Sequence, residues 1–135
     1  MIGILIVSHG RLAEALISSV QFLVGNLKRV KGISIWPKDR KEEVKDRIRQ
    51  GIGEVDEGDG VVILTDVLGG TPTNLSLSFL ENKQVEVVTG VNLPMVLTLS
   101  SYRKGRSLRE MGRLVKKSGR RSIILAKKLL RPNGG

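Results

Sequence analysis

Two residues that could carry out chemistry lie at the ends of separate apolar runs. His9, the only histidine, follows the run Ile2–Val7 and Ser8, and Asp66 follows the run Val61–Thr65. A neutral imidazole is a good nucleophile near pH 7, and a carboxylate on its other ring nitrogen fixes the tautomer and stabilises the cation that forms. If the two runs are neighbouring strands, the pair predicts a nucleophilic histidine oriented by an aspartate.

A glycine-rich turn, residues 69–74, comes shortly after Asp66 and reads Gly-Gly-Thr-Pro-Thr-Asn. Glycine lets the backbone approach a ligand closely, Thr71 is a good helix N-cap, and Pro72 suits the first helical position. The free N–H groups of Thr73 and Asn74, at the start of such a helix, would point towards a phosphoryl group. With the histidine and the aspartate, this turn predicts phosphoryl transfer through a phosphohistidine. The predicted phosphoryl-binding residues are Gly70, Thr71, Thr73 and Asn74.

Short apolar runs alternate along the chain with segments of helical periodicity, a pattern typical of buried strands joined by helices. It predicts an α/β fold: a doubly wound, mainly parallel sheet with helices on both faces, plus a short C-terminal strand. Ligands of such sheets bind beyond the carboxyl ends of the strands, where the histidine and the aspartate are expected. The predicted strands are 2–7, 29–36, 61–65, 85–89 and 122–126, and the predicted helices are 11–24, 39–55, 72–80, 94–102 and 107–118, the last ending at Gly119.

Length and composition indicate one globular domain. The chain has 135 residues, of which 40% are hydrophobic and 27% charged. We expect a domain over residues 1–126 and a basic tail over 127–135. The absence of cysteine and the single histidine argue against a metal site, and no cofactor is expected. The N-terminal apolar run is too short for a signal peptide or a membrane span, so the sequence predicts a cytoplasmic protein.

Positive charge is concentrated at the C-terminal end. Residues 1–100 contain 11 Lys and Arg against 12 Asp and Glu, whereas residues 101–135 contain 12 against 1. Such asymmetry is compatible with weak contact between the C-terminal region and an anionic surface. Only four aromatic residues are present and they are scattered, so we expect no nucleic-acid binding. The preferred interpretation is a solvated helix face.

Three motifs in register carry a resemblance to a known family. Ser8-His9-Gly10, the stretch from Thr65 to Asn74, and Gly90-Val91-Asn92-Leu93-Pro94-Met95 resemble the mannose-family enzyme IIA domain of the bacterial phosphoenolpyruvate-dependent sugar phosphotransferase system. The resemblance implies that His9 accepts a phosphoryl group on Nε2 from the phosphocarrier protein HPr and passes it to a IIB component. We expect that component to be a separate protein.

The same resemblance implies roles for individual residues and an assembly. Asp66 would orient His9 through Nδ1, and the loop at Gly70 and Thr71 would help to hold the phosphoryl group. The family further implies a homodimer, in which the short C-terminal strand pairs across the subunits in an antiparallel arrangement, and no metal.

Alternatives remain open at this point. Asp66 could simply cap a loop, and Asn92 could simply start a helix. A hydrolase using Ser8 is disfavoured, because adjacent strand residues point to opposite faces. Three alternative functions remain. The chain could be a regulatory phosphohistidine protein, or the phosphotransfer subunit of dihydroxyacetone kinase, which shares the Val-Ser-His start. It could also be a basic binding module.

Overall fold

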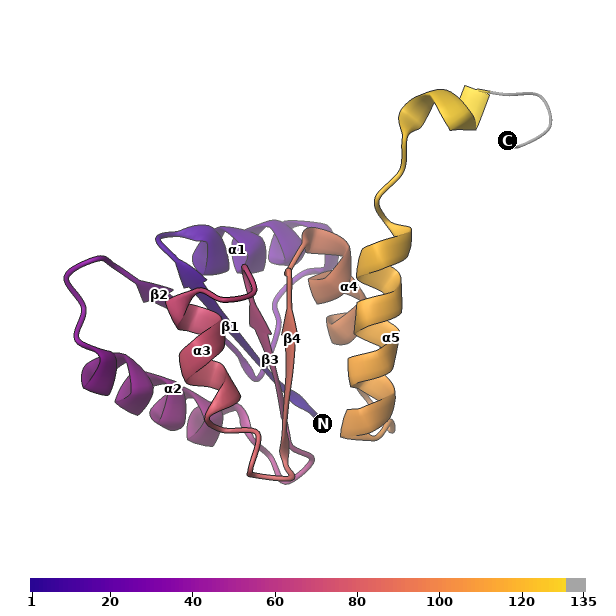
Figure 1. The fold of residues 1–135 in the computed structure, drawn as a ribbon. Helices are drawn as coiled ribbons and strands as arrows, with labels where there is room; N and C mark the ends of the chain where they lie inside the picture. The colour runs from indigo at the N-terminus through magenta and orange to yellow at the C-terminus, as the bar shows by residue number, and fades with distance from the viewer. Residues whose placement is uncertain (131–135) are drawn as a thin grey trace.

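The computed structural model describes residues 1–130, and its strands form one parallel sheet of order β2-β1-β3-β4 (Figure 1). This confirms the predicted α/β fold. Of the predicted basic tail, residues 131–135 lie outside the described residues. The strands are β1 (Gly3–His9), β2 (Val30–Ile35), β3 (Val61–Thr65) and β4 (Val85–Thr89), and the helices are α1 (Leu12–Val24), α2 (Lys41–Val55), α3 (Thr71–Leu77), α4 (Leu93–Tyr102) and α5 (Leu108–Arg121).

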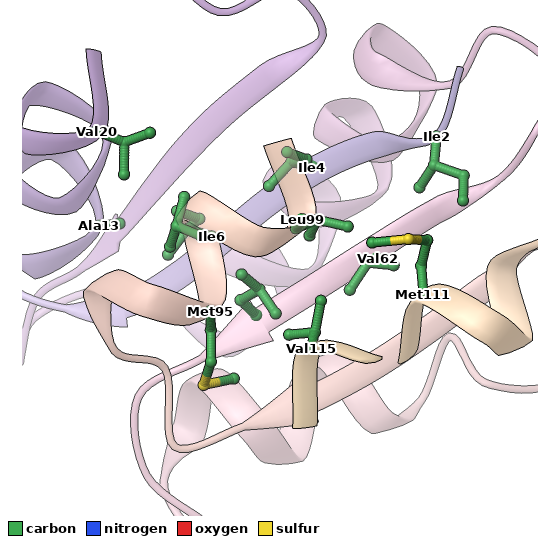
Figure 2. Close-up of a cluster of buried hydrophobic side chains, with 12 residues drawn as sticks. Ile2, Ile4, Ile6, Ala13, Val20, Val62, Met95, Leu99, Met111 and Val115 are labelled. Carbon is green, nitrogen blue, oxygen red and sulfur yellow. The ribbon is translucent and has the colours of Figure 1, made fainter. Parts of the chain in front are cut away.

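Helices cover both faces of the sheet, and this explains why the central strands β1 and β3 are buried, largely apolar runs. Alternate residues of β1 point to opposite faces: Ile4 and Ile6 pack with α1, α4 and α5, whereas Leu5 and Val7 pack with α2. Figure 2 shows the first of these clusters, in which side chains from β1, β3 and three helices converge. Burying each such Ile or Leu stabilises the fold by roughly 1.5–3 kcal/mol.

The central strands β1 and β3 lie next to each other, which was the condition for the predicted catalytic pair. Val7 is the register partner of Thr65, so the residues that follow, Ser8-His9 and Asp66, emerge side by side at the carboxyl edge of the sheet. Both β1 and β3 are fully buried up to this edge. The fold therefore brings residues 57 positions apart in sequence to one place.

Helix α1 buries only part of its apolar surface. Ala13 and Val20 are buried, with Leu16 and Ile17 packed beside them, whereas Leu12 is 43% exposed. The buried hydroxyl of Ser8 accepts the N–H of Ala13 at 2.8 Å and so holds the start of the helix. Ser8 therefore points into the fold, as the argument against a hydrolase required.

Two C-terminal features of the single chain differ from the predictions. Helix α5 continues to Arg121 instead of ending at Gly119. Gly119 is buried against α4, and a Cβ at this position would lie 2.6 Å from Cγ of Met95, so the glycine allows the two helices to pack closely. The predicted strand 122–126 does not form within the single chain. Residues 122–125 have no regular structure and Ala126–Leu130 is a 3₁₀ helix, because this segment extends away from the sheet and pairs with no strand among residues 1–130 (Figure 1).

Arg103 belongs to the structural core, although its position in the sequence places it in the basic region. Its residue surface is 3% exposed, and its guanidinium donates to the carbonyls of Ile2, Lys28 and Arg29 at 3.1, 2.6 and 3.3 Å. Burial lowers the pKa of Arg103, which the nearby negative charge of Glu57 opposes. The side chain ties the segments that enter β1 and β2 to the end of α4.

Candidate functional site

His9 and Asp66 form a hydrogen-bonded pair at the carboxyl edge of the sheet. Nδ1 of His9 lies 2.7 Å from Oδ2 of Asp66, and the same oxygen accepts the backbone N–H of His9 at 2.8 Å. The second oxygen, Oδ1, accepts the N–H of Val67 at 2.8 Å. Three hydrogen bonds thus fix the carboxylate relative to both the imidazole and its backbone.

The ionised carboxylate determines how the imidazole presents itself. Burial opposes ionisation of Asp66, but the hydrogen bonds from His9 and Val67 outweigh it, and the pKa of Asp66 lies below its ordinary value. An ionised carboxylate can only accept, so neutral His9 carries its proton on Nδ1 and has a lone pair on Nε2. The Asp66 side chain is 10% exposed and that of His9 is 54% exposed. The arrangement presents a nucleophilic nitrogen to a reactant arriving from solvent.

Gly70 lies against the imidazole, on the side of the nucleophilic nitrogen. A Cβ at this position would lie 2.8 Å from Cε1 and 3.5 Å from Nε2 of His9. The backbone of Gly70 has φ −83° and ψ 167°, which any residue can adopt. The glycine is therefore required by the closeness of the ring and not by backbone conformation.

Thr71 and Asn74 belong to the first turn of the helix that follows Gly70. Helix α3 begins at Thr71 with Gly70 as its N-cap, one residue earlier than predicted, and Thr71 makes no capping bond through its side chain. The N–H of Asn74 donates to the carbonyl of Gly70 at 2.9 Å, and its amide donates to the carbonyl of Gly69 at 3.2 Å. The prediction of a free N–H at Asn74 is thus wrong, because the first helical turn uses it.

Thr73 is buried and its hydroxyl faces the protein. Its Oγ1 lies 2.6 Å from Oγ1 of Thr65, donates to the carbonyl of Val67 at 2.6 Å, and lies 3.2 Å from Oγ1 of Thr89. A hydroxyl with three protein partners has no capacity left for a phosphoryl group. Among the described residues, no hydrogen-bond acceptor pairs with the backbone N–H groups of Thr71 and Thr73, so both remain candidates for binding the phosphoryl group.

Comparison with known proteins fits this geometry. Residues 3–116 match the EIIA-man family, described as PTS system fructose IIA component. The chain belongs to this family and is a IIA component of a sugar phosphotransferase system. It is 31% identical over 124 residues to the mannose-specific EIIAB component of Escherichia coli K12, covering 90% of this chain but only 38% of that protein. It is 28% identical to the fructose-specific EIIA component of Bacillus subtilis, covering 82% of this chain and 77% of that one.

Solved structures show the same likeness for the IIA fold. A phosphotransferase system component EIIA from Streptococcus agalactiae superposes with a TM-score of 0.87 at 26% identity, covering 95% of this chain and 99% of that one. A PTS IIA protein associated with the fucose utilization operon of Streptococcus pneumoniae gives 0.84 at 30% identity, covering 96% of each chain. The resemblance stated from the sequence is thereby confirmed.

Exposed apolar side chains lie on the segments that adjoin His9 and Asp66 in this IIA chain, a feature that the sequence reading missed. Leu12, Trp36, Val67 and Leu68 are 43%, 47%, 54% and 78% exposed. Each comes from a segment joined to the site: Leu12 follows the His9 loop, Trp36 follows the β2 residue paired with His9, and the other two follow Asp66. We call these four residues the apolar rim. A helical wheel that placed Ala13 on the buried face would have shown Leu12 to be free.

Other parts of the predicted site have structural duties. The side chain of Asn92 accepts the N–H of Met95 at 3.0 Å and donates to the carbonyl of Gly119 at 3.2 Å, so it caps α4.

Over residues 1–130, no group of three or more metal-ligating side chains is found. Within the same range, none of the helices combines the length and the hydropathy that a membrane span requires.

Proposed function

We propose that this IIA component is a histidine phosphoryl carrier, in which His9 Nε2 accepts the phosphoryl group of phospho-HPr and passes it to a IIB component. One observation carries the proposal: the 2.7 Å contact between Nδ1 and an ionised Asp66, which leaves the lone pair of a half-exposed histidine on Nε2. The family membership supports it.

The transfer step needs only groups that lie at this edge. The Nε2 lone pair attacks the phosphorus of the donor's phosphohistidine, the new N–P bond forms as the donor's N–P bond breaks, and the donor's imidazole leaves with that electron pair. The proton on Nδ1 remains there, and the negative charge of Asp66 stabilises the resulting cationic ring. Transfer to IIB is the same displacement in the opposite sense.

We assign stabilisation of the phosphoryl oxygens to the backbone of the turn. The N–H groups of Thr71 and Thr73 lie at the start of α3, beside Gly70, which borders Nε2. Gly70 contributes by leaving room for the phosphoryl group. Asn74 supports the turn through its bonds to Gly69 and Gly70.

Partner docking falls to the apolar rim. Protein interfaces concentrate apolar and aromatic side chains at their centre, and a phosphoryl transfer between two proteins must exclude water from the reacting atoms. Leu12, Trp36, Val67 and Leu68 provide such a surface around His9. Donor and acceptor would meet it in turn, in the cytoplasm.

We also propose a homodimer held together by the C-terminal segment. Strand β4 forms the edge of the sheet, and Ile123, Ile124 and Leu125 are 80%, 55% and 70% exposed in the single chain. A hollow of about 240 Å³ between β4 and α5 includes Val88, Thr89 and Ile123 in its lining. Pairing residues 122–126 with the β4 edge of a second copy would satisfy the backbone of both.

Labelling tests the carrier function directly. Incubation with phosphoenolpyruvate, enzyme I and HPr should add one phosphoryl group that is labile to acid and stable to base, and His9→Ala should take up none. Phe22→Ala serves as the control, because this exposed side chain lies near the C-terminal end of α1, away from the His9 loop and outside the apolar rim. If His9→Ala is labelled at the normal rate, another residue is the acceptor and the proposal fails.

Sedimentation tests the dimer separately. The wild-type chain should sediment as a dimer, and Ile124→Asp should sediment as a monomer, because a carboxylate cannot be buried in the paired strand without a partner. Leu129→Asp, in the 3₁₀ helix beyond the segment, is the control. A wild-type monomer at micromolar concentration would contradict the assembly.

A further inference from the structure

Thr73 occupies a place that neither the transfer chemistry nor the fold core explains. Its side chain enters the junction where β3, β4 and the Asp66 loop meet, and its residue surface is only 1% exposed. Thr65 and Thr89 are register partners at the ends of β3 and β4. One hydroxyl thus contacts both strand ends and the carbonyl of Val67.

The direction of these hydrogen bonds is fixed by what each group can do. The carbonyl of Val67 can only accept, so the single proton of the Thr73 hydroxyl goes to it. Thr65 and Thr89 must then donate to the two lone pairs of Thr73 Oγ1, at 2.6 and 3.2 Å. All bonding capacity of the Thr73 hydroxyl is used, and the resulting chain of bonds ends on the loop.

Val67 is the residue through which this network meets the site. Its N–H donates to Oδ1 of Asp66 at 2.8 Å, while its carbonyl is held by Thr73. The other oxygen of Asp66 holds Nδ1 of His9. Only two hydrogen-bonded links, Thr73 to Val67 and Val67 to Asp66, therefore separate the buried hydroxyl from the carboxylate that sets the histidine tautomer.

We propose that Thr73 is a positioning residue for the phosphoryl transfer: its buried hydroxyl holds the Val67 peptide, and so the Asp66 carboxylate and Gly70, in the places that His9 requires. This inference rests on His9 being the phosphoryl acceptor. A displacement of the carboxylate by a fraction of an ångström weakens the 2.7 Å bond to Nδ1, and transfer rates depend steeply on such placement.

The test compares Thr73→Val, which keeps the shape and removes the hydroxyl, with Thr73→Ser, which keeps the hydroxyl. Ser76→Ala is the matched control, because Ser76 is equally buried in α3 and its hydroxyl donates to Pro72 without touching the loop. We measure the initial rate of labelling through HPr and, by nitrogen NMR of the unphosphorylated chain, the fraction of His9 protonated on Nδ1.

Thr73→Val should label about tenfold more slowly, on the scale of a misplaced catalytic group, and should show more of the Nε2-protonated tautomer. Thr73→Ser should restore the Nδ1-protonated tautomer and most of the rate that Thr73→Val loses, and Ser76→Ala should match the wild type in both measurements. A Thr73→Val protein with wild-type rate and tautomer, or a Ser76→Ala protein with the same changes, would overturn the proposal.

Two further arrangements keep the outcome decisive. Should Thr73→Val fail to fold, Thr89→Val removes a half-buried hydroxyl of the same network, and its tautomer should shift in the same direction with a rate loss of about twofold. Unchanged values there would contradict the network. If the wild-type chain takes no label while Thr73→Val still shifts the tautomer, the carrier function fails and the positioning role stands.

Discussion

The carboxyl edge of β1 and β3 and the outer face of α5 differ in how their charges are arranged. At the edge, one carboxylate accepts three hydrogen bonds and is nearly buried. On α5, the cationic side chains face solvent, and within residues 1–130 none of them lies within salt-bridge distance of a carboxylate. These are Arg109, Arg113, Lys116, Lys117, Arg120 and Arg121.

The difference shows that the amount of charge does not locate function in this molecule. Helix α5 carries six cationic side chains against one carboxylate, about half of the net charge of +10, yet no ion pair fixes these cations relative to one another or to a second element. The edge has a single ionised carboxylate, Asp66, which three hydrogen bonds hold in a fixed position relative to the His9 imidazole. We expect the reaction at the His9–Asp66 pair, because only a partner in a fixed position sets the tautomer of an imidazole and so its nucleophilic nitrogen.

Changing the carboxylate at the edge should have the largest effect of the changes considered below. Asp66→Asn should slow phosphorylation about 10²-fold, the scale of a lost orienting group, because an amide NH₂ can face Nδ1 and favour the Nε2-protonated tautomer. The rate is measured as acid-labile phosphoryl incorporation from phospho-HPr.

Asp39→Asn provides the matched control for that change. Its carboxylate accepts the N–H of Trp36 at 2.8 Å in a loop of the same edge, without contact to His9. It should label at close to the wild-type rate. An equal loss in both variants would show that the edge responds to any change of charge, and would remove the contrast with α5.

Filling the space beside the imidazole should have the next largest effect. Gly70→Ala places a Cβ 2.8 Å from Cε1 of His9, so the ring or the turn must move, and labelling should slow by about tenfold. Gly53→Ala is the control, since a Cβ there meets nothing within 4 Å. Wild-type kinetics of Gly70→Ala would mean that the turn adapts freely.

The bonds to Asp66 also predict a pH dependence of stability. Its folded-state pKa lies below the ordinary value of 3.8, so the ionised carboxylate stabilises the fold above that pH. This contribution is lost as the pH falls from about 3.8 through the folded-state pKa. Urea unfolding of the wild type and Asp66→Asn should give a constant difference at neutral pH that shrinks only below about pH 4. A loss near pH 6 would contradict the assignment.

Neutralising the α5 face should have the smallest effect. Gln at Arg113, Lys116, Lys117 and Arg120 should leave the fold intact and change the labelling rate by about twofold or less at 0.15 M salt, where charges beyond about 8 Å are screened. Tight binding of the wild type to DNA or anionic vesicles at this salt, lost in the variant, would instead make α5 a binding face.

Much of the fold followed from local patterns in the sequence. The bounds of strands β3 and β4 were predicted to the residue, because runs rich in β-branched residues and bounded by glycine or polar turns leave little choice of where a strand begins and ends. The pairing of His9 with Asp66 required only that β1 and β3 be neighbours. Both inferences depend on the sheet, which buries its strands on two faces.

The remainder depended on contacts between elements distant in sequence. Gly119 looked like a helix end but is a contact point with Met95, and Arg103 looked like surface charge but bonds three carbonyls of the core. Thr73 was expected to bind the phosphoryl group through its N–H, but no local pattern indicates that its hydroxyl turns inward to Val67. Composition and spacing do not encode the direction of a side chain within a loop.

The most direct test of the account is the position of the phosphoryl group on the imidazole. Nitrogen-15 and phosphorus-31 NMR of the phosphorylated wild-type chain should assign the phosphoryl group to Nε2 of His9, with the Nδ1 proton still bonded to Asp66. Phosphorylation on Nδ1 would require the 2.7 Å bond to Asp66 to break, and phosphorylation elsewhere would exclude His9. Either result would contradict the central claim that Asp66 directs the nucleophile.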